Sequence, residues 1–195
     1  MPNGRPTFWL IAGPNGIGKT TFARARLEAI SGSVNFVNMD EIARGLSPLR
    51  PSVAERDAAE VALERARRFI AARTTFAMET TLSGRAHLRL VETAKLSGME
   101  TALMFFAAAD PRICLERIAR RVAEGGHDVD RDVALRRFGR GASNFSLYAA
   151  AVDLWRLYDA SGAKPVLAAE GVTARLAFAD PDILARLPNV RLPSA

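Results

Sequence analysis

The stretch Ala12-Gly-Pro-Asn-Gly-Ile-Gly-Lys-Thr-Thr21 decides the fold of this chain. Gly13 and Gly18 bracket four residues and lead directly into Lys19 and Thr20, which matches the pattern G-x-x-x-x-G-K-[ST]. A short apolar run precedes the loop, and apolar residues at helical spacing follow it. This strand, loop and helix context predicts a loop that holds phosphate groups on its backbone N–H groups.

The loop predicts a nucleotide and a metal ion as ligands. We expect Lys19 to reach the β- and γ-phosphates of ATP and the Thr20 hydroxyl to ligate Mg²⁺. The residues expected to contact the nucleotide are Gly13, Asn15, Gly16, Ile17, Gly18, Lys19, Thr20 and Thr21.

Length and composition are those of one domain. The 195 residues, 49% of them hydrophobic, can bury one substantial core, so we expect a single domain over residues 1–195. The only cysteine, Cys114, lies in an apolar helical pattern, which favours a buried helix position over a nucleophile. Neither a signal-peptide core nor a run of the ~18 apolar residues that span a bilayer is present, so we expect a cytoplasmic protein without membrane contact.

The charge balance is basic. Lysine and arginine total 27 against 21 acidic residues, a net charge of +6, and only three of the basic residues are lysines. The arginines are spread through the expected helices instead of forming one block with interleaved aromatic residues. A polyanionic ligand explains them as well as a nucleic acid, and we do not expect a nucleic-acid partner.

Strand and helix signals alternate along the chain, which predicts an α/β fold with a mostly parallel sheet and helices on both faces. The expected strands are 7–12, 34–38, 75–78, 101–108, 165–169 and 174–178. The expected helices are 19–30, 53–72, 85–97, 111–123, 130–140, 143–161 and 181–187, and residues 188–195 are expected to be flexible. The aromatic residues Phe145, Tyr148, Trp155 and Tyr158 recur at near-helical spacing and are expected to pack in the core.

Carboxylates follow two of the expected strands. Asp40 follows the second strand, at the sheet edge where ligands bind in such folds. It can accept the proton of a substrate hydroxyl or hold the metal through water; the alternative is a helix N-cap. Glu79 ends the third strand and is expected to bind substrate with Thr80, Thr81 and Arg85, although Thr and Ser before a helix are also ordinary caps.

Two arginine-bearing helices flank Gly125 and Gly126, which is the layout of a lid over residues 117–140. Arg117 and Arg121 are four residues apart and share a helical face. Arginines supplied in this way neutralise the charge of a phosphoryl group in transfer, and the alternative is a solvated basic face. The chain has only one other histidine and one cysteine, too few for a zinc site that includes His127. His127 is therefore expected to shape the lid or touch the ligand.

The chain resembles the short proteins of the zeta-toxin family of P-loop kinases from about Phe8 to Leu167. The resemblance rests on an ordered series of motifs: GPNGIGKTTFA, FVNMDEIARGLSP, FAMETTLSGR, ERIARRVAEGGHDVD, RRF and YDAS. It implies the three-layer α/β sandwich of P-loop NTPases and an ATP- and Mg²⁺-dependent phosphotransferase.

The resemblance also implies roles for individual residues. Lys19 and Thr20 correspond to the nucleotide and metal contacts, Asp40 to the catalytic base and Glu79 to a substrate-side carboxylate. The arginines that correspond to phosphate-sensing positions are Arg117, Arg121 and Arg136. Characterised zeta toxins phosphorylate a hydroxyl of UDP-N-acetylglucosamine and are inhibited by a small antitoxin, so the resemblance implies a small-molecule hydroxyl acceptor and an antitoxin partner.

Other functions remain open at this stage. The acceptor can instead be the hydroxyl of a nucleoside, a nucleotide or an antibiotic. A nucleic-acid-associated, switch-like ATPase is a further alternative, which salt-sensitive binding to DNA or RNA would support.

Overall fold

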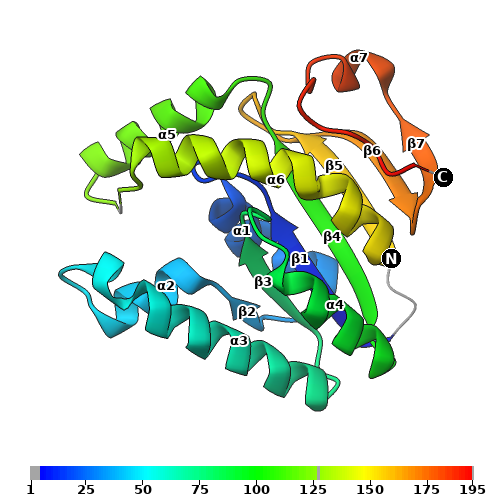
Figure 1. Ribbon diagram of the computed structural model, residues 1–195, viewed down its shortest axis with the longest axis horizontal. Coiled ribbons are helices and arrows are strands. Elements are labelled where there is room, and N and C mark those ends of the chain that lie inside the picture. Colours follow the sequence, from blue (N-terminus) through cyan, green and yellow to red (C-terminus); the bar gives the residue numbers. More distant parts are fainter. Residues whose placement is uncertain (1–4, 127, 195) are drawn as a thin grey trace.

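The computed structural model describes residues 5–126 and 128–194 and contains one seven-stranded sheet in the order β2-β3-β1-β4-β5-β6-β7 (Figure 1). The strands are β1 Thr7–Ala12, β2 Phe36–Val37, β3 Phe76–Thr80, β4 Glu100–Ala107, β5 Leu154–Asp159, β6 Val166–Val172 and β7 Arg175–Ala179. The helices are α1 Lys19–Ser31, α2 Met39–Leu46, α3 Glu55–Ala71, α4 Ala86–Leu96, α5 Pro111–Ala123, α6 Arg131–Ala151 and α7 Pro181–Leu184, and a 3₁₀ turn covers Pro51–Ala54.

The sheet is parallel over its first five strands. β1 lies between β3 and β4, and β2 and β5 extend the sheet on either side in the same direction. β6 and β7 then pair antiparallel and close one edge. The carboxyl ends of β1 to β5 therefore meet at one edge, and the expected α/β fold with a mostly parallel sheet is confirmed.

Helices cover both faces of the sheet, which gives three layers (Figure 1). On one face, Ala23 and Leu27 of α1 pack with Ile11 of β1 in one buried cluster. On the other face, α3, α4 and α6 contribute buried side chains such as Ile70, Leu90 and Phe145 to a second cluster. The buried sheet thus holds its polar strand ends rigidly at the one edge where the phosphate loop emerges.

One expected helix is wrong. Residues 143–161 do not form a helix: α6 runs without a break from Arg131 to Ala151, and β5 begins at Leu154. Phe145 on α6 and Trp155 on β5 meet edge to face with ring centroids 5.7 Å apart, and both are buried. The expected core role of the aromatic residues is therefore confirmed, but they come from two elements.

The other boundaries differ less. The second expected strand, 34–38, is reduced to β2, and Asn38 caps α2, a helix that the expected helices did not include. Val190 and Leu192 pack against the core, while the expected flexibility of residues 188–195 stays a prediction. In the described ranges, no helix is both long and apolar enough to cross a membrane.

Candidate active site

The phosphate loop follows β1 and turns through three glycines with positive φ, at +145° for Gly13, +78° for Gly16 and +100° for Gly18. A Cβ atom on Gly13 would lie 2.3 Å from the carbonyl oxygen of Phe106, and one on Gly16 would lie 2.4 Å from that of Cys114. Both approaches are impossible for a side chain, so the pattern of glycines is a steric requirement.

Lys19, the first residue of α1, is only 5% exposed despite its charge. Its Nζ atom donates a hydrogen bond of 2.9 Å to the Pro14 carbonyl and lies 3.6 Å from Oε1 of Glu79. Burial of an ammonium group requires such partners. The lysine therefore spans the inside of the loop, where the phosphates of a nucleotide would lie.

Thr20, Asn38 and Glu79 form one hydrogen-bonded cluster. The Thr20 hydroxyl donates to Oε2 of Glu79 at 2.8 Å, and the Asn38 amide donates to the same oxygen at 2.8 Å. Asn38 also caps α2 by accepting from the N–H of Glu41. Sequence reasoning did not select Asn38, and its position directly after β2 was the available signal. Glu79, expected on the substrate side, is grouped here with the phosphate-loop residues.

Asp40 lies in the first turn of α2, where its negative charge is favourable. Because Asn38 is the cap, the alternative that Asp40 serves as the N-cap is wrong. Neighbouring Glu41 is paired with Arg24 at 3.2 Å and with Arg44 at 3.0 Å. In contrast, the Asp40 carboxylate has no hydrogen-bond partner within the described ranges, and it remains available to a ligand.

Arg117 of α5 joins the phosphate loop to the loop that follows β5. Its guanidinium donates to the carbonyl oxygens of Ala160, Ser161 and Gly162 at 2.9, 3.0 and 2.8 Å. A longer bond of 3.4 Å reaches the Ile17 carbonyl in the phosphate loop. This guanidinium, expected to act on phosphate, is thus committed to backbone carbonyls from two loops.

The loop after β5 is itself held firmly. Asp159 accepts hydrogen bonds from the N–H and the hydroxyl of Ser161 at 2.9 and 2.6 Å. The same hydroxyl oxygen accepts from the Ala109 N–H at 2.9 Å. These contacts explain why the sequence YDAS occurs at this strand end: it shapes the carbonyl triad that receives Arg117.

The other lid arginines have different surroundings. Arg137, which was not selected from the sequence, donates to the side-chain oxygen of Asn15 in the phosphate loop at 3.5 Å. Arg136 points to a neighbouring cavity, and Arg121 is half-buried near the end of α5. His127 lies outside the described residues. Closure of a lid over 117–140 stays a prediction.

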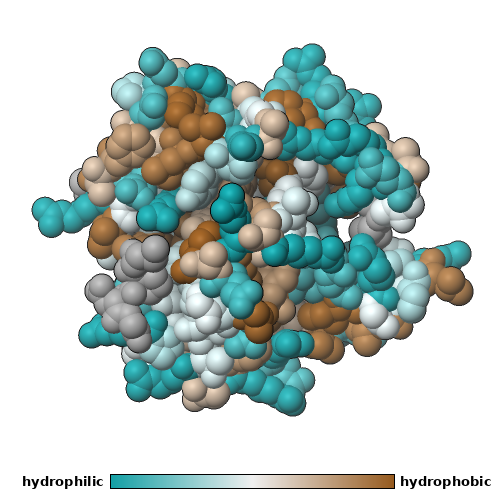
Figure 2. Space-filling model, turned by 180° about the vertical axis from the view of Figure 1, so that it is seen from behind, coloured by the Kyte–Doolittle hydropathy of each residue, from teal (hydrophilic) through white to brown (hydrophobic). Residues whose placement is uncertain are grey.

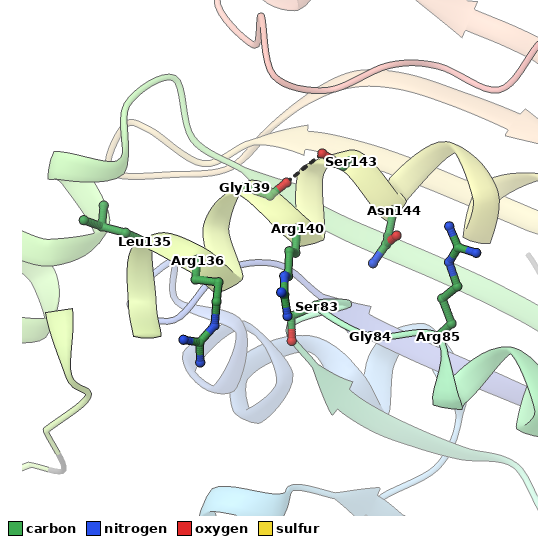
Figure 3. A pocket seen from close by; sticks show the side chains of 9 residues that line it. All are labelled: Ser83, Gly84, Arg85, Leu135, Arg136, Gly139, Arg140, Ser143 and Asn144. Carbon is green, nitrogen blue, oxygen red and sulfur yellow. Dashed lines mark hydrogen bonds between the residues drawn. The ribbon is translucent and has the colours of Figure 1, made fainter. Parts of the chain in front are cut away.

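A cavity of about 480 Å³ lies between α6 and the loop that connects β3 to α4 (Figure 3). Arg136 and Arg140 extend from α6, and Arg85 extends from the start of α4 toward α6 beside Asn144. The residues that line the cavity are Ser83, Gly84, Arg85, Leu135, Arg136, Gly139, Arg140, Ser143 and Asn144. They include three guanidinium groups and no carboxylate, so the cavity is strongly positive.

Two side chains of α6 fix the wall of this cavity. Asn144 donates to the Leu82 carbonyl at 2.7 Å, and the Tyr148 hydroxyl donates to the Gly84 carbonyl at 2.9 Å. Burial raises the pKa of Tyr148 to about 12, so the phenol keeps its proton and remains a donor at neutral pH. The loop after β3 is therefore held in place before any ligand arrives.

Thr80 and Thr81, the two threonines expected to contact substrate, make their hydrogen bonds within the loop that follows β3. Thr80 is buried, and its hydroxyl oxygen accepts from the Leu82 N–H at 3.1 Å and lies 3.4 Å from Nδ1 of His87. Burial lowers the pKa of His87, which keeps the imidazole neutral beside the threonine. Thr81 donates to the Ser83 hydroxyl at 3.0 Å. Substrate contact by either threonine stays a prediction.

The surroundings of Cys114 disfavour its thiolate. It is buried on α5, and burial raises its pKa to about 11, although the nearby charges of Lys19 and Arg117 oppose the shift. The thiolate is the reactive form, so burial and the raised pKa both disfavour a nucleophilic role. The expected buried helix position of Cys114 is confirmed.

The donor set beside the loop suits a hard divalent cation. In the described ranges, no group of three or more His, Cys, Asp or Glu side chains could hold a metal ion alone. The Thr20 hydroxyl and the Glu79 carboxylate are 2.8 Å apart, and both are oxygen donors of the kind that Mg²⁺ prefers. Mg²⁺ is commonly held by one or two such groups together with nucleotide phosphates and water, so these residues fit it.

The fold is shared with solved structures that are distant in sequence. A chain from the PezAT chromosomal toxin-antitoxin system of Streptococcus pneumoniae superposes with a TM-score of 0.69 and 13% identity, covering 96% of this chain and 80% of that one. A chain of the AvrRxo1-ORF1:ORF2 complex with ATP gives a TM-score of 0.73 and 16% identity, covering 99% of this chain and 67% of that one. The P-loop fold expected from the resemblance is therefore confirmed.

Sequence comparison gives a relative with higher sequence identity and a matching family model. An uncharacterized protein of Haemophilus influenzae is 32% identical over 126 residues, which cover 65% of this chain and 88% of the relative. The family model described as an AAA domain matches residues 8–147, from β1 to the second half of α6. This match includes the phosphate loop, Asp40, Glu79 and the arginine helices. The chain belongs to the AAA domain family.

Proposed function

We propose that this protein is an ATP-dependent kinase that transfers the γ-phosphoryl group of ATP to a hydroxyl of a small molecule. The observation that carries the proposal is the cluster of Lys19, Thr20, Asn38 and Glu79 around the phosphate loop, with the unpaired Asp40 at the same sheet edge. The fold likeness to a chain in a complex solved with ATP supports a nucleotide as the ligand of this loop.

On the nucleotide side, the loop N–H groups and Lys19 would hold the β- and γ-phosphates. Thr20 and Glu79 would hold Mg²⁺, which supplies neutralisation of the charge on the phosphates. Asn38 keeps the Glu79 carboxylate beside Thr20 through its 2.8 Å hydrogen bond. This chain's own residues thereby orient the γ-phosphoryl group toward the edge where Asp40 lies.

On the acceptor side, Asp40 would accept the proton of the attacking hydroxyl. The acceptor oxygen forms a bond to the γ-phosphorus while the bond from that phosphorus to the bridging oxygen breaks, and ADP leaves with the bridging oxygen. Asp40 suits this role because no described side chain is hydrogen-bonded to it, whereas Glu41 is occupied by Arg24 and Arg44.

The arginine cavity supports an acceptor that carries negative charge. Arg85, Arg136 and Arg140 line the cavity without a salt bridge to any carboxylate in the described ranges, and guanidinium groups bind phosphate groups well. A nucleotide sugar such as UDP-N-acetylglucosamine has both the required hydroxyl and the required phosphates, and we propose it as the first acceptor to test.

The test is transfer of label from γ-labelled ATP in the presence of Mg²⁺ and single acceptors: UDP-N-acetylglucosamine, nucleosides, nucleotides and aminoglycosides. Label that moves to an acceptor with the wild-type protein, but not with Lys19→Ala or Asp40→Asn, supports the kinase. Label released only as phosphate, with release stimulated by DNA or RNA, would instead support the switch-like ATPase. Unchanged transfer by Asp40→Asn would remove Asp40 from the mechanism.

A protein partner is a second part of the proposal. Both reported structural neighbours come from two-protein systems, one described as a toxin-antitoxin system and the other as a complex of two gene products. We propose that this kinase is toxic when it is expressed alone and that a small antitoxin protein inhibits it. Growth arrest on expression of the wild-type protein, relieved by Lys19→Ala, supports this role, and equal growth with both proteins would contradict it.

A further inference from the structure

Arg137 of α6 lies against the phosphate loop, and the mechanism above does not use it. Its half-buried guanidinium donates to Oδ1 of Asn15 over a long distance of 3.5 Å. Asn15 is only 7% exposed and directly follows Pro14, whose carbonyl accepts from Nζ of Lys19 at 2.9 Å. Arg137 therefore approaches the same segment of the loop that Lys19 contacts from the inside.

The packing of α6 holds Arg137 at this place. The next residue, Phe138, is 8% exposed and belongs to the buried cluster that includes Ile17 of the phosphate loop. One turn further on, Gly141 lies so close to the loop after β3 that a Cβ atom would be 2.5 Å from the Thr81 carbonyl oxygen. The backbone that carries Arg137 is thus fixed beside the phosphate loop before any nucleotide binds.

The charge of Arg137 has no counterion in the protein. Within residues 5–126 and 128–194, Arg137 forms no ion pair with a carboxylate, and Asn15 offers it only a neutral amide oxygen. A partly buried cation is unfavourable without an anionic partner, and guanidinium groups bind phosphate oxygens more strongly than neutral acceptors. A phosphate at this end of the loop would replace a long, weak hydrogen bond with a strong one.

The other arginines near the site are directed elsewhere. Hydrophilic and apolar residues interleave across the surface seen in Figure 2, so surface composition alone does not single out one arginine. Arg117 is bonded to the carbonyl oxygens of 160–162, whereas Arg136 and Arg140 line the arginine cavity (Figure 3). Successive residues of a helix are about 100° apart around its axis, so Arg136 and Arg137 face different sites.

We propose that Arg137 binds the γ-phosphate of ATP and stabilises the charge that develops on it during transfer. This role rests on the proposed kinase function, and it departs from the resemblance, which implies Arg117, Arg121 and Arg136 at the phosphates. In the transfer step, the acceptor oxygen bonds to the γ-phosphorus, the bond to the bridging oxygen breaks, and ADP leaves with that electron pair. Asp40 takes the hydroxyl proton, while Arg137 neutralises the phosphoryl oxygens and exchanges no proton.

The test compares two nucleotides that differ in the γ-phosphate: ADP and AMP-PNP, a non-hydrolysable analogue of ATP. Isothermal titration calorimetry with the full chain and Mg²⁺ measures both affinities. Arg137→Gln is expected to weaken AMP-PNP binding about tenfold or more and to change ADP binding by less than about twofold, because only the γ-phosphate contact is lost. Retained ADP binding also shows that the variant is folded. Arg131→Gln, at an exposed position of the same helix, is expected to change neither affinity.

The outcomes that contradict this role differ from those that contradict the kinase. If the wild-type protein binds neither nucleotide, both proposals are wrong. If it binds AMP-PNP and Arg137→Gln binds AMP-PNP equally well, only the role of Arg137 is wrong. Equal losses of ADP and AMP-PNP affinity in Arg137→Gln would mean that Arg137 supports the loop through Asn15 and does not bind the γ-phosphate. A loss of AMP-PNP affinity in Arg136→Gln alone would also overturn the proposal and support the position that the resemblance implies.

Discussion

The hydroxyl of Thr20 donates a hydrogen bond of 2.8 Å to the Glu79 carboxylate and thereby joins the first turn of α1 to the end of β3. The two residues are 59 positions apart in sequence, and only the parallel pairing of β1 with β3 brings them together. Glu79 therefore lies beside the phosphate loop, and we propose that it acts on the nucleotide side of the site. The sequence alone assigned Thr20 to the metal ion and Glu79 to the substrate, whereas the structure joins the two side chains in one cluster.

Glu79→Gln is expected to lower turnover and to shift its Mg²⁺ dependence to higher concentrations. The amide keeps the volume of the side chain but loses the charge that holds a cation, a change that typically costs about 10–100-fold in metal affinity or activity. Initial rates across a Mg²⁺ titration measure the effect. Glu41→Gln, which alters only an exposed pair with Arg24 and Arg44, is the control. A lower rate with wild-type Mg²⁺ dependence would instead support a role of Glu79 in binding the substrate.

Arg117→Lys is expected to raise KM for ATP about tenfold while leaving kcat nearly unchanged. A lysine cannot reproduce a planar guanidinium that serves several carbonyls, and each lost hydrogen bond is worth about 1 kcal/mol. A catalytic role on the transferred phosphoryl group would instead lower kcat by orders of magnitude. Steady-state kinetics decide between the two, with Arg120→Lys on the exposed side of α5 as the control.

The sequence predicted the phosphate loop and its flanking elements because local rules dominate there. Gly13 and Gly16 are required by close backbone approaches, and Lys19 by the phosphates that we propose the loop holds. The carboxylates at the ends of β2 and β3 followed from the rule for parallel sheets. These features depend on spacing within a few residues, so a single sequence contains them.

The helix predicted over 143–161 failed for a different reason. No glycine or proline separates Ala151, the end of α6, from Leu154, the start of β5, and the aromatic spacing continues across the junction. The alternating burial of Trp155, Leu157 and Asp159 is the strand signal, but it becomes visible only once β4 lies beside β5. Contacts such as those of Arg117 with 160–162 were likewise hidden, because they join segments more than 40 residues apart.

Gly16→Ala is expected to destabilise the protein more than Gly18→Ala. Both glycines have positive φ, but a Cβ on Gly16 would lie 2.4 Å from the Cys114 carbonyl oxygen, whereas one on Gly18 would meet no atom within 4 Å. The difference in stability between the two variants therefore measures the steric clash separately from the backbone strain that both share. Thermal unfolding without nucleotide measures it, at about 2–4 °C per kcal/mol for a chain of this size. Equal melting temperatures would mean that the loop moves away from α5.

Asp153→Asn is expected to destabilise the fold at neutral pH and much less in acid. Oδ2 of Asp153 accepts from the N–H and hydroxyl of Thr101 at 2.9 and 2.8 Å, and Lys95 lies 3.0 Å from Oδ1. Burial alone raises the pKa of this carboxyl, but the hydrogen bonds from Thr101 and Lys95 outweigh it and hold the pKa below its usual value. The exposed ion pair adds little, so the loss of about 1–3 kcal/mol comes mainly from the Thr101 contacts.

The pH dependence of this variant follows from the lowered pKa. Because the folded state binds the proton more weakly than the unfolded state, the stabilisation by Asp153 is complete above the unfolded pKa of about 3.9. It is lost as the pH falls through the lower folded value. Urea unfolding of wild type and Asp153→Asn at neutral pH and at successively lower pH measures the difference in free energy. A difference that stays constant on acidification would show that Asp153 stabilises the start of β5 by packing and not by its charge.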